Sequence, residues 1–131
     1  MITKKTIGYT VSAILTILIF NTKSMAQYHK IYRIAKITVD PAQLDQYQAA
    51  LKEQMTTAMA VEPGVLSYYA VSDKKDASHI TIFEIYADST AYQAHIQTPH
   101  FKKYKETVKD MVKSLYLEDV DVIGIAKKPG M

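Results

Sequence analysis

The sequence predicts an α+β fold with the element order β-α-β-β-α-β. Four segments have the alternating or β-branched composition of strands, and two regions carry apolar residues at helical spacing. Their order along the chain is strand, helix, strand, strand, helix, strand. In such an arrangement the helices cover one face of an antiparallel sheet and leave the other face open.

The first 26 residues have the parts of a secretory signal peptide. A basic start, MITKK, precedes a mostly apolar run over Ile7–Phe20, and Ser24 and Ala26 stand three residues and one residue before a cleavage point. The run is shorter than the roughly 18 to 20 residues that a spanning helix needs. We therefore expect cleavage after Ala26, export to the periplasm or the medium, no membrane association after cleavage, and one domain over residues 27–131. An uncleaved anchor is the alternative.

Charge and cysteine content exclude several classes of function. The chain has 16 basic and 13 acidic residues, but Lys4, Lys5 and Lys23 precede the expected cleavage point, so residues 27–131 carry 13 of each sign. Since no basic patch remains, a nucleic-acid partner is not expected. The absence of cysteine excludes disulfides and thiolate metal sites.

Residues 30–40, KIYRIAKITVD, alternate in the manner of a strand with one better-buried face. Asp40 is then a helix cap, Pro41 suits the first helical position, and Gln43 completes the spacing of a capping box. The helix that follows presents a single apolar stripe, made of Leu44, Tyr47, Leu51, Met55 and Ala58. The EPG sequence at 62–64 ends this helix.

Residues 65–72, VLSYYAVS, and 79–86, HITIFEIY, are predicted strands because of their β-branched and aromatic content, and a polar turn joins them. Both strands carry apolar groups on both faces; on the first, Leu66, Tyr68 and Ala70 oppose Val65, Tyr69 and Val71. The open face of the sheet would therefore be apolar. We expect a homodimer with sheets packed face to face, and a monomer with an apolar surface is the alternative.

The segment AHIQTPHFKKY at 94–104 contains His95 and His100. On one continuous helix a separation of five positions would turn the two side chains about 140° apart, so they could not share a face. Thr98 is a good cap and Pro99 a good first residue for a new helix. This break aims each histidine separately without making them a pair, so no metal site is expected.

The new helix is expected to carry the apolar residues Phe101, Tyr104, Val108, Met111, Val112 and Leu115. The stretch LEDVDVIGIA, residues 117–126, is expected to form the fourth strand and to close the domain. The complete order is that of a ferredoxin-like protomer.

Three stretches resemble the antibiotic biosynthesis monooxygenase family, and within it the small quinol monooxygenases: EPGVLSYYAV, IFEIYAD and, most specifically, AYQAHIQTPHFKKYKETV. The resemblance spans roughly residues 30–124. It implies a dimeric α+β barrel of ferredoxin-like protomers, each with an apolar pocket between sheet and helices. It also implies oxygenation of hydroquinone-like or phenolic aromatics without a cofactor, with a small aromatic or quinone-type molecule as the ligand.

The haem-degrading branch of the same superfamily has tryptophan at the position of His95 and its axial histidine at the position of Lys105. Neither residue is present, and no other ligand set with convincing spacing is found, so neither haem nor a structural metal is expected. A non-catalytic barrel that binds a small apolar or quinone-like ligand is the rival interpretation, because a pocket with one histidine serves either function.

The implied chemistry needs a group that deprotonates the substrate. His95 is predicted to be this general base, because a pKa near 6.5 suits a phenolic proton; a structural histidine is the alternative. His100 is a second candidate, with a structural role in the first helical turn as its alternative. Glu84 either acts on the substrate with a raised pKa or is held by Arg33 or a lysine in a structural pair.

Four tyrosines are predicted to line the pocket and to bind a substrate oxygen through their hydroxyl groups. They are Tyr68, Tyr69, Tyr86 and Tyr92. Tyrosine is also favoured in strands, so simple packing is the alternative for each of them.

Overall fold

The computed structural model describes residues 29–130, and the expected signal peptide lies outside the described residues. The elements are β1 (Ile31–Val39), the short 3-10 helix η1 (Pro41–Gln43), α1 (Leu44–Val61), β2 (Val65–Ser72), β3 (His79–Tyr86), α2 (Ser89–His95), α3 (Pro99–Val108) and β4 (Val112–Val120). This confirms the predicted order, with the second helical region divided into α2 and α3.

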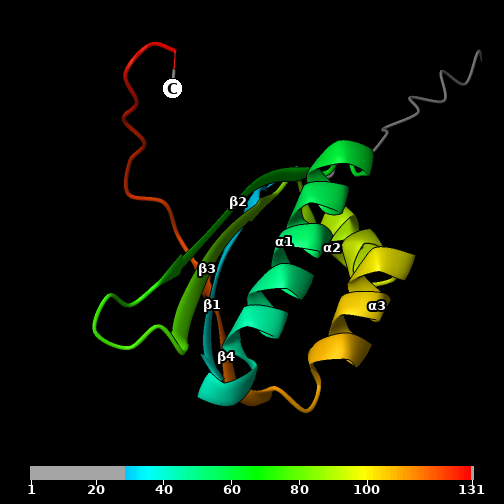
Figure 1. Cartoon of the computed structure of the whole chain (residues 1–131). Helices are drawn as coiled ribbons and strands as arrows, with labels where there is room; N and C mark the ends of the chain where they lie inside the picture. The colour runs from blue at the N-terminus through cyan, green and yellow to red at the C-terminus, as the bar shows by residue number, and fades with distance from the viewer. Residues whose placement is uncertain (1–28, 131) are drawn as a thin grey trace, which may run out of the picture.

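The four strands form one antiparallel sheet in the order β2-β3-β1-β4. All three α-helices lie on the same side of this sheet, and the opposite face is open (Figure 1). The predicted α+β, ferredoxin-like fold is therefore confirmed for the single chain.

The core lies between the sheet and the helices. The apolar face of β1 contributes Ala35, Ile37 and Val39, and the stripe of α1 contributes Tyr47 and Leu51, all buried. Buried residues of β3 and α3 complete the same cluster: Ile80, Ile82 and Val108. Each large apolar side chain buried in this way stabilises the fold by about 1.5–3 kcal/mol.

The predicted cap at Asp40 is present. Its Oδ1 atom accepts a hydrogen bond of 3.0 Å from the backbone N–H of Ala42. Gln43 contributes its backbone N–H to the Asp40 carbonyl rather than a capping side chain, so residues Pro41–Gln43 form a 3-10 turn before the α-helix proper begins at Leu44.

The expected limits of the last helix and the last strand were wrong. Helix α3 ends at Val108, and β4 occupies Val112–Val120 rather than 117–126. Val112 pairs with Val39 across an irregularity in the ladder, so apolar spacing that suits a helix serves a strand here. The strand ends at Val120 because its partner Tyr32 lies next to the first residue of β1, and no paired strand continues beyond that point.

The alternation expected in β2 is interrupted by a bulge. The register shifts between Val65 and Ser67, so Val65 is buried with Tyr86 while Tyr68 still turns towards the helices. Tyr69 consequently lies on the open face and is 59% exposed.

The open face is aromatic and apolar. Tyr32 of β1 stacks on Phe83 of β3, with ring centroids 6.4 Å apart, and Tyr116 of β4 is 59% exposed. Beyond β4 the chain runs away from the helices with Ile123 and Ile125 exposed (Figure 1).

None of the helices within residues 29–130 combines the length and apolar character needed to cross a membrane.

Candidate active site

The helix break between α2 and α3 positions two histidines. The Thr98 hydroxyl accepts a 3.3 Å hydrogen bond from the Phe101 N–H and donates one of 2.7 Å to the His95 carbonyl. Pro99 then begins α3 as predicted. His95 is thus the last residue of α2 and His100 the second residue of α3, at an angle that a continuous helix would not allow.

The turn after α1 carries the carboxylate that both histidines contact. Glu62 is the C-terminal cap of α1, and its N–H donates a 2.9 Å hydrogen bond to the Ala58 carbonyl. Two residues later, Gly64 passes so close to α2 that an added Cβ would lie 2.5 Å from the Cβ of Ala91. The glycine therefore allows the turn and α2 to approach each other.

Gly64→Ala is expected to destabilise the protein by about 1–3 kcal/mol, because the new methyl group must push α2 away from the turn. The measurement is urea unfolding followed by circular dichroism. Gly124→Ala is the matched control, since its Cβ would meet nothing within 4 Å. Adding Ala91→Gly to Gly64→Ala should recover part of the loss; equal stability of both single variants would contradict the packing argument.

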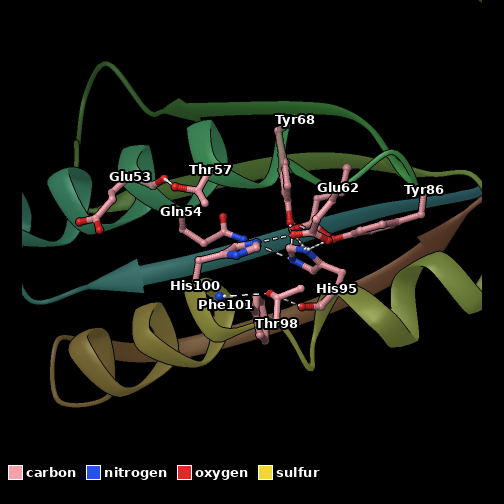
Figure 2. A network of polar contacts seen from close by, with 11 residues as sticks. Glu53, Gln54, Thr57, Glu62, Tyr68, Tyr86, His95, Thr98, His100 and Phe101 are labelled. Atoms are coloured by element: carbon pink, nitrogen blue, oxygen red, sulfur yellow. Dashed lines mark hydrogen bonds and ion pairs between the residues drawn. The ribbon is translucent and has the colours of Figure 1, made fainter. Parts of the chain in front are cut away.

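Glu62, His95 and His100 form one cluster, and Figure 2 shows both rings directed at the carboxylate. Nδ1 of His95 lies 3.0 Å from each Glu62 oxygen, and Nε2 of His100 contacts Oε1. The expectation that the break would not pair the histidines was therefore wrong. Because α3 starts in a new direction, it turns the His100 ring back towards α2.

This cluster is compact enough to consider a metal. One ligand atom from each of the three residues lies within 4.8 Å of the others, and two imidazoles with a carboxylate suit zinc or a similar ion. Hydrogen bonds alone also satisfy these atoms, because within residues 29–130 no buried side-chain nitrogen or oxygen lacks a partner. The geometry is therefore also that of a carboxylate that orients two imidazole rings.

The other side of the His95 ring faces the sheet. Its Nε2 lies 2.8 Å from the Tyr68 hydroxyl and 3.3 Å from the side-chain nitrogen of Gln54, and the Phe101 ring packs edge-on with centroids 4.8 Å apart. His95 is 0% exposed. Burial lowers the pKa of His95 below its usual value, and the hydrogen bond to Glu62 opposes this effect in part.

Two tyrosines connect this histidine to a carboxyl group on β3. The Tyr68 and Tyr86 hydroxyl oxygens are 2.9 Å apart, and the Tyr86 hydroxyl donates a 3.0 Å hydrogen bond to Oε2 of Glu84. Burial raises the pKa of Glu84 to about 7, against the smaller opposing effects of the Tyr86 hydrogen bond and the Arg33 charge. A carboxyl group with this pKa can accept or donate a proton near neutral pH.

A cavity of about 90 Å³ lies between the sheet and the helices. This volume has room for more than one water molecule. Its wall is largely apolar, and its polar lining residues include Arg33, Gln54, Tyr68, Glu84, Tyr86, Tyr92, Tyr104 and Lys105. An apolar cavity with a few convergent polar groups and a perturbed carboxyl group has the character of a small-molecule site.

The structure brings most of the predicted site residues together, at different distances from the cavity. Glu84 and the tyrosines Tyr68, Tyr86 and Tyr92 line it. His95 lies behind Tyr68, so its Nε2 atom reaches the cavity through the Tyr68 hydroxyl and the Gln54 amide and not directly.

Two predicted site residues lie away from the cavity wall. His100 lines a separate small cavity next to α1 and α3. Tyr69 lies on the open face of the sheet. Their predicted roles in the reaction stay predictions.

Arg33 does not neutralise Glu84 by direct pairing. Its guanidinium lies 2.7 Å from the Asp119 carboxylate and 4.0 Å from the centre of the Tyr92 ring. The alternative of a structural pair between Glu84 and Arg33 is therefore not what the structure contains.

Sequence reasoning missed Glu62 and Gln54. The EPG sequence marks Glu62 only as part of a helix-ending turn. Gln54 lies on the apolar stripe of α1 between Leu51 and Met55 but is polar. A polar residue inside an apolar stripe was the available signal for Gln54, which is only 4% exposed. No local pattern marks Glu62.

Fold and site together define a small ferredoxin-like α+β domain with a partly open, aromatic-lined cavity and the carboxyl group of Glu84 in its wall. The model of the antibiotic biosynthesis monooxygenase family matches residues 30–107, and the chain belongs to this family. The family resemblance seen in the sequence is thereby confirmed.

Solved structures agree with this assignment. A Bacteroides thetaiotaomicron protein provisionally described as an antibiotic biosynthesis monooxygenase is 48% identical, with a TM-score of 0.74 over 76% of this chain and 97% of that one. A Lactobacillus acidophilus protein provisionally described as a monooxygenase is 34% identical, with a TM-score of 0.69 over 72% of this chain and 45% of that one.

One curated sequence relative is about twice as long as the part that matches this chain. An uncharacterised Synechocystis protein is 28% identical over 76 residues, which are 58% of this chain and 51% of that protein. The chain thus spans about half the length of this relative.

Proposed function

We propose that the protein is a cofactor-independent monooxygenase that acts on hydroquinone-like or phenolic substrates. The observation that carries the proposal is Glu84, a partly buried carboxyl group with a pKa of about 7 in the wall of an aromatic cavity. Near neutral pH its carboxylate form takes the proton of a substrate hydroxyl group. The tyrosine hydroxyls beside it position the substrate oxygen.

The electron balance of this reaction needs no further reductant. A hydroquinone that becomes a hydroxyquinone loses four electrons, and dioxygen accepts four when one atom enters the ring and the other leaves as water. Deprotonation matters because a phenolate gives an electron to oxygen far more readily than a phenol. The protein therefore has to deprotonate, to orient and to exclude water.

The test is oxygen uptake by purified residues 27–131 with reduced 1,4-benzoquinone, reduced 1,4-naphthoquinone and catechol. Turnover above the rate of spontaneous oxidation supports the proposal. His95→Ala tests the predicted base: unchanged turnover would remove His95 from the reaction and leave the enzyme in place. Saturable binding of quinones without any turnover would favour the non-catalytic barrel.

We also propose that two copies associate through the open face of the sheet. The open face carries the exposed rings of Tyr69 on β2 and Tyr116 on β4 and, on the two strands between them, the half-buried stacked rings of Tyr32 and Phe83. A second copy would bury this surface. Such sheet-to-sheet packing is the dimeric barrel that the family resemblance implies.

Tyr69→Lys is expected to shift the protein from dimer to monomer in light scattering coupled to size exclusion. Tyr69 lies on the open face of the edge strand β2, so the lysine would place a charge within the proposed interface. Val61→Lys is the matched control, because Val61 is similarly exposed, at 62% against 59%, but ends α1 on the helical side. A dimer that survives Tyr69→Lys unchanged, or a wild-type monomer, would contradict the proposed interface.

Export is the remaining part of the proposal, supported by the signal-like pattern of the first 26 residues. Expression of the full chain in a bacterial host should yield a periplasmic protein whose first residue is Gln27, as read by N-terminal sequencing. A full-length product that stays in the membrane fraction would favour the uncleaved anchor.

A further inference from the structure

An unbroken line of hydrogen bonds runs from the cavity to the buried histidine. Glu84 and Tyr86 are joined at 3.0 Å, Tyr86 and Tyr68 at 2.9 Å, and Tyr68 and His95 at 2.8 Å. Only the first three of these groups line the cavity. Proton transfer from the substrate to Glu84 does not by itself explain why the fully buried imidazole of His95 lies at the other end of this series of hydrogen bonds.

The line needs a fixed number of protons. It contains three contacts, and each is a hydrogen bond only if one proton lies between its two atoms. The two tyrosine hydroxyls supply two protons. The third must be on the carboxyl group of Glu84 or on Nε2 of His95, since burial raises the pKa of both tyrosines and keeps them neutral.

From this count we propose that Glu84, Tyr86, Tyr68 and His95 share one exchangeable proton and act as a single base, with His95 as its positioning residue. The proposal rests on the proposed function and adds to it the path by which the substrate proton leaves the cavity. His95 acts on the substrate only through the two tyrosine hydroxyls.

The proton transfer is balanced. A substrate O–H bond breaks and an O–H bond forms on Glu84. Glu84 then gives a proton to the Tyr86 oxygen, Tyr86 gives its own to Tyr68, and Tyr68 gives its own to Nε2 of His95. The result is a Glu84 carboxylate, two neutral tyrosines and an imidazolium. When Glu84 is ionised and Nε2 of His95 carries no proton, one of the three contacts has two lone pairs facing each other. The four groups in this state therefore take up a proton readily.

Charged neighbours stabilise both ends of this transfer. The carboxylate of Glu62 accepts from Nδ1 of His95 and faces the new imidazolium, with His100 on its other side. Both residues are partly exposed, at 12% and 16% of their side chains, and so connect this end to water. At the cavity end, the charge of Arg33 favours the carboxylate form of Glu84.

The first experiment needs no substrate. Histidine and glutamate carrying ¹³C and ¹⁵N in the side chain are followed by NMR from pH 5 to pH 9. One shared proton predicts a single common midpoint for Glu84 and Nε2 of His95 in the wild type. Tyr68→Phe, which keeps the ring and removes the hydroxyl, is expected to separate the two midpoints by at least one pH unit.

Tyr47→Phe is the matched control, because Tyr47 is a buried tyrosine whose hydroxyl bonds only to Tyr104 at 2.7 Å and does not line the cavity. Its Glu84 and His95 midpoints should stay together. Separate midpoints in the wild type would overturn the proposal, as would midpoints that still coincide in Tyr68→Phe. Stoichiometric zinc bound through His95 would overturn it too, because the metallated ring could not become an imidazolium.

The second experiment uses reduced 1,4-naphthoquinone or another substrate that the wild type oxidises. Tyr68→Phe should lower kcat about 10-fold or more and make it rise with imidazole buffer concentration, while the wild type and Tyr47→Phe show no buffer dependence. Full turnover of Tyr68→Phe without buffer dependence would overturn the relay and leave the monooxygenase intact. If no substrate is oxidised at all, the proposed function fails, and the NMR midpoints still decide the relay.

Discussion

Glu84→Gln is expected to lower kcat for a hydroquinone by about 10²–10⁴-fold at pH 7, the usual contribution of a positioned general base. Glutamine has the same shape as glutamate and retains a hydrogen bond to Tyr86, but its amide cannot take a proton. Oxygen uptake under saturating substrate measures the effect. Because Glu84 lies in the cavity wall, the loss should appear in kcat more than in KM.

The pH profile gives an independent check on this first prediction. Since the pKa of Glu84 is about 7, kcat/KM of the wild type should rise between pH 5 and 7 and level off above pH 8. The residual activity of Glu84→Gln should lack this rise. The control is Glu106→Gln, which changes a carboxylate whose side chain is 73% exposed on α3 and should leave the profile as it is. An unchanged kcat in Glu84→Gln would remove Glu84 from the reaction.

The same substitution is expected to stabilise the protein above pH 7, by about 3 kcal/mol relative to its effect at pH 4. Burial raises the pKa of Glu84 from 4.5 to about 7, and each pKa unit corresponds to about 1.4 kcal/mol. Thermal or urea unfolding of the wild type and of Glu84→Gln across this pH range gives the difference. It requires no substrate.

The sign of this effect follows from proton binding. Between about pH 4.5 and pH 7 the folded wild type holds the Glu84 proton and the unfolded chain has released it, so folding stability falls as the pH rises through this range. Glutamine has no proton to lose, so Glu84→Gln lacks this loss. A stability difference that is constant from pH 4 to pH 8 would show that the pKa of the carboxyl group is not raised, and would contradict the basis of the catalytic role that we propose for Glu84.

Loss of activity together with a gain in stability would be informative. Replacing a residue that serves only packing lowers the stability of the protein. A charged carboxyl group in an apolar cavity wall itself lowers that stability, so replacing it with a neutral group raises the stability. The two measurements on one variant therefore separate a functional Glu84 from a structural one.

The local sequence determined most of the secondary structure. The alternation in residues 30–40, the apolar stripe that begins at Leu44 and the Thr98–Pro99 cap each predict a local conformation that the structure contains. These signals depend on neighbours within a few positions, because strand and helix periods and capping hydrogen bonds are local properties.

The limits of the last strand depended on a distant partner. The apolar residues from Val108 to Leu115 fit a helix by their spacing, yet Val112 pairs with Val39. The strand ends at Val120, whose partner Tyr32 is the second residue of β1. Since a strand end is set by the length of its neighbour, the sequence of 112–126 alone did not contain it.

For the site, the sequence by itself determined which residues have the required chemistry: His95, Glu84 and the tyrosines of β2 and β3. Only the tertiary structure decided their arrangement. A bulge in β2 turns Tyr68 towards the helices, and the Gly64 turn brings Glu62 against the end of α2. As a result His95 is behind the cavity and Glu84 within its wall. The physical reason is that such contacts join side chains more than 25 positions apart, and their geometry comes from how the elements pack rather than from any local pattern.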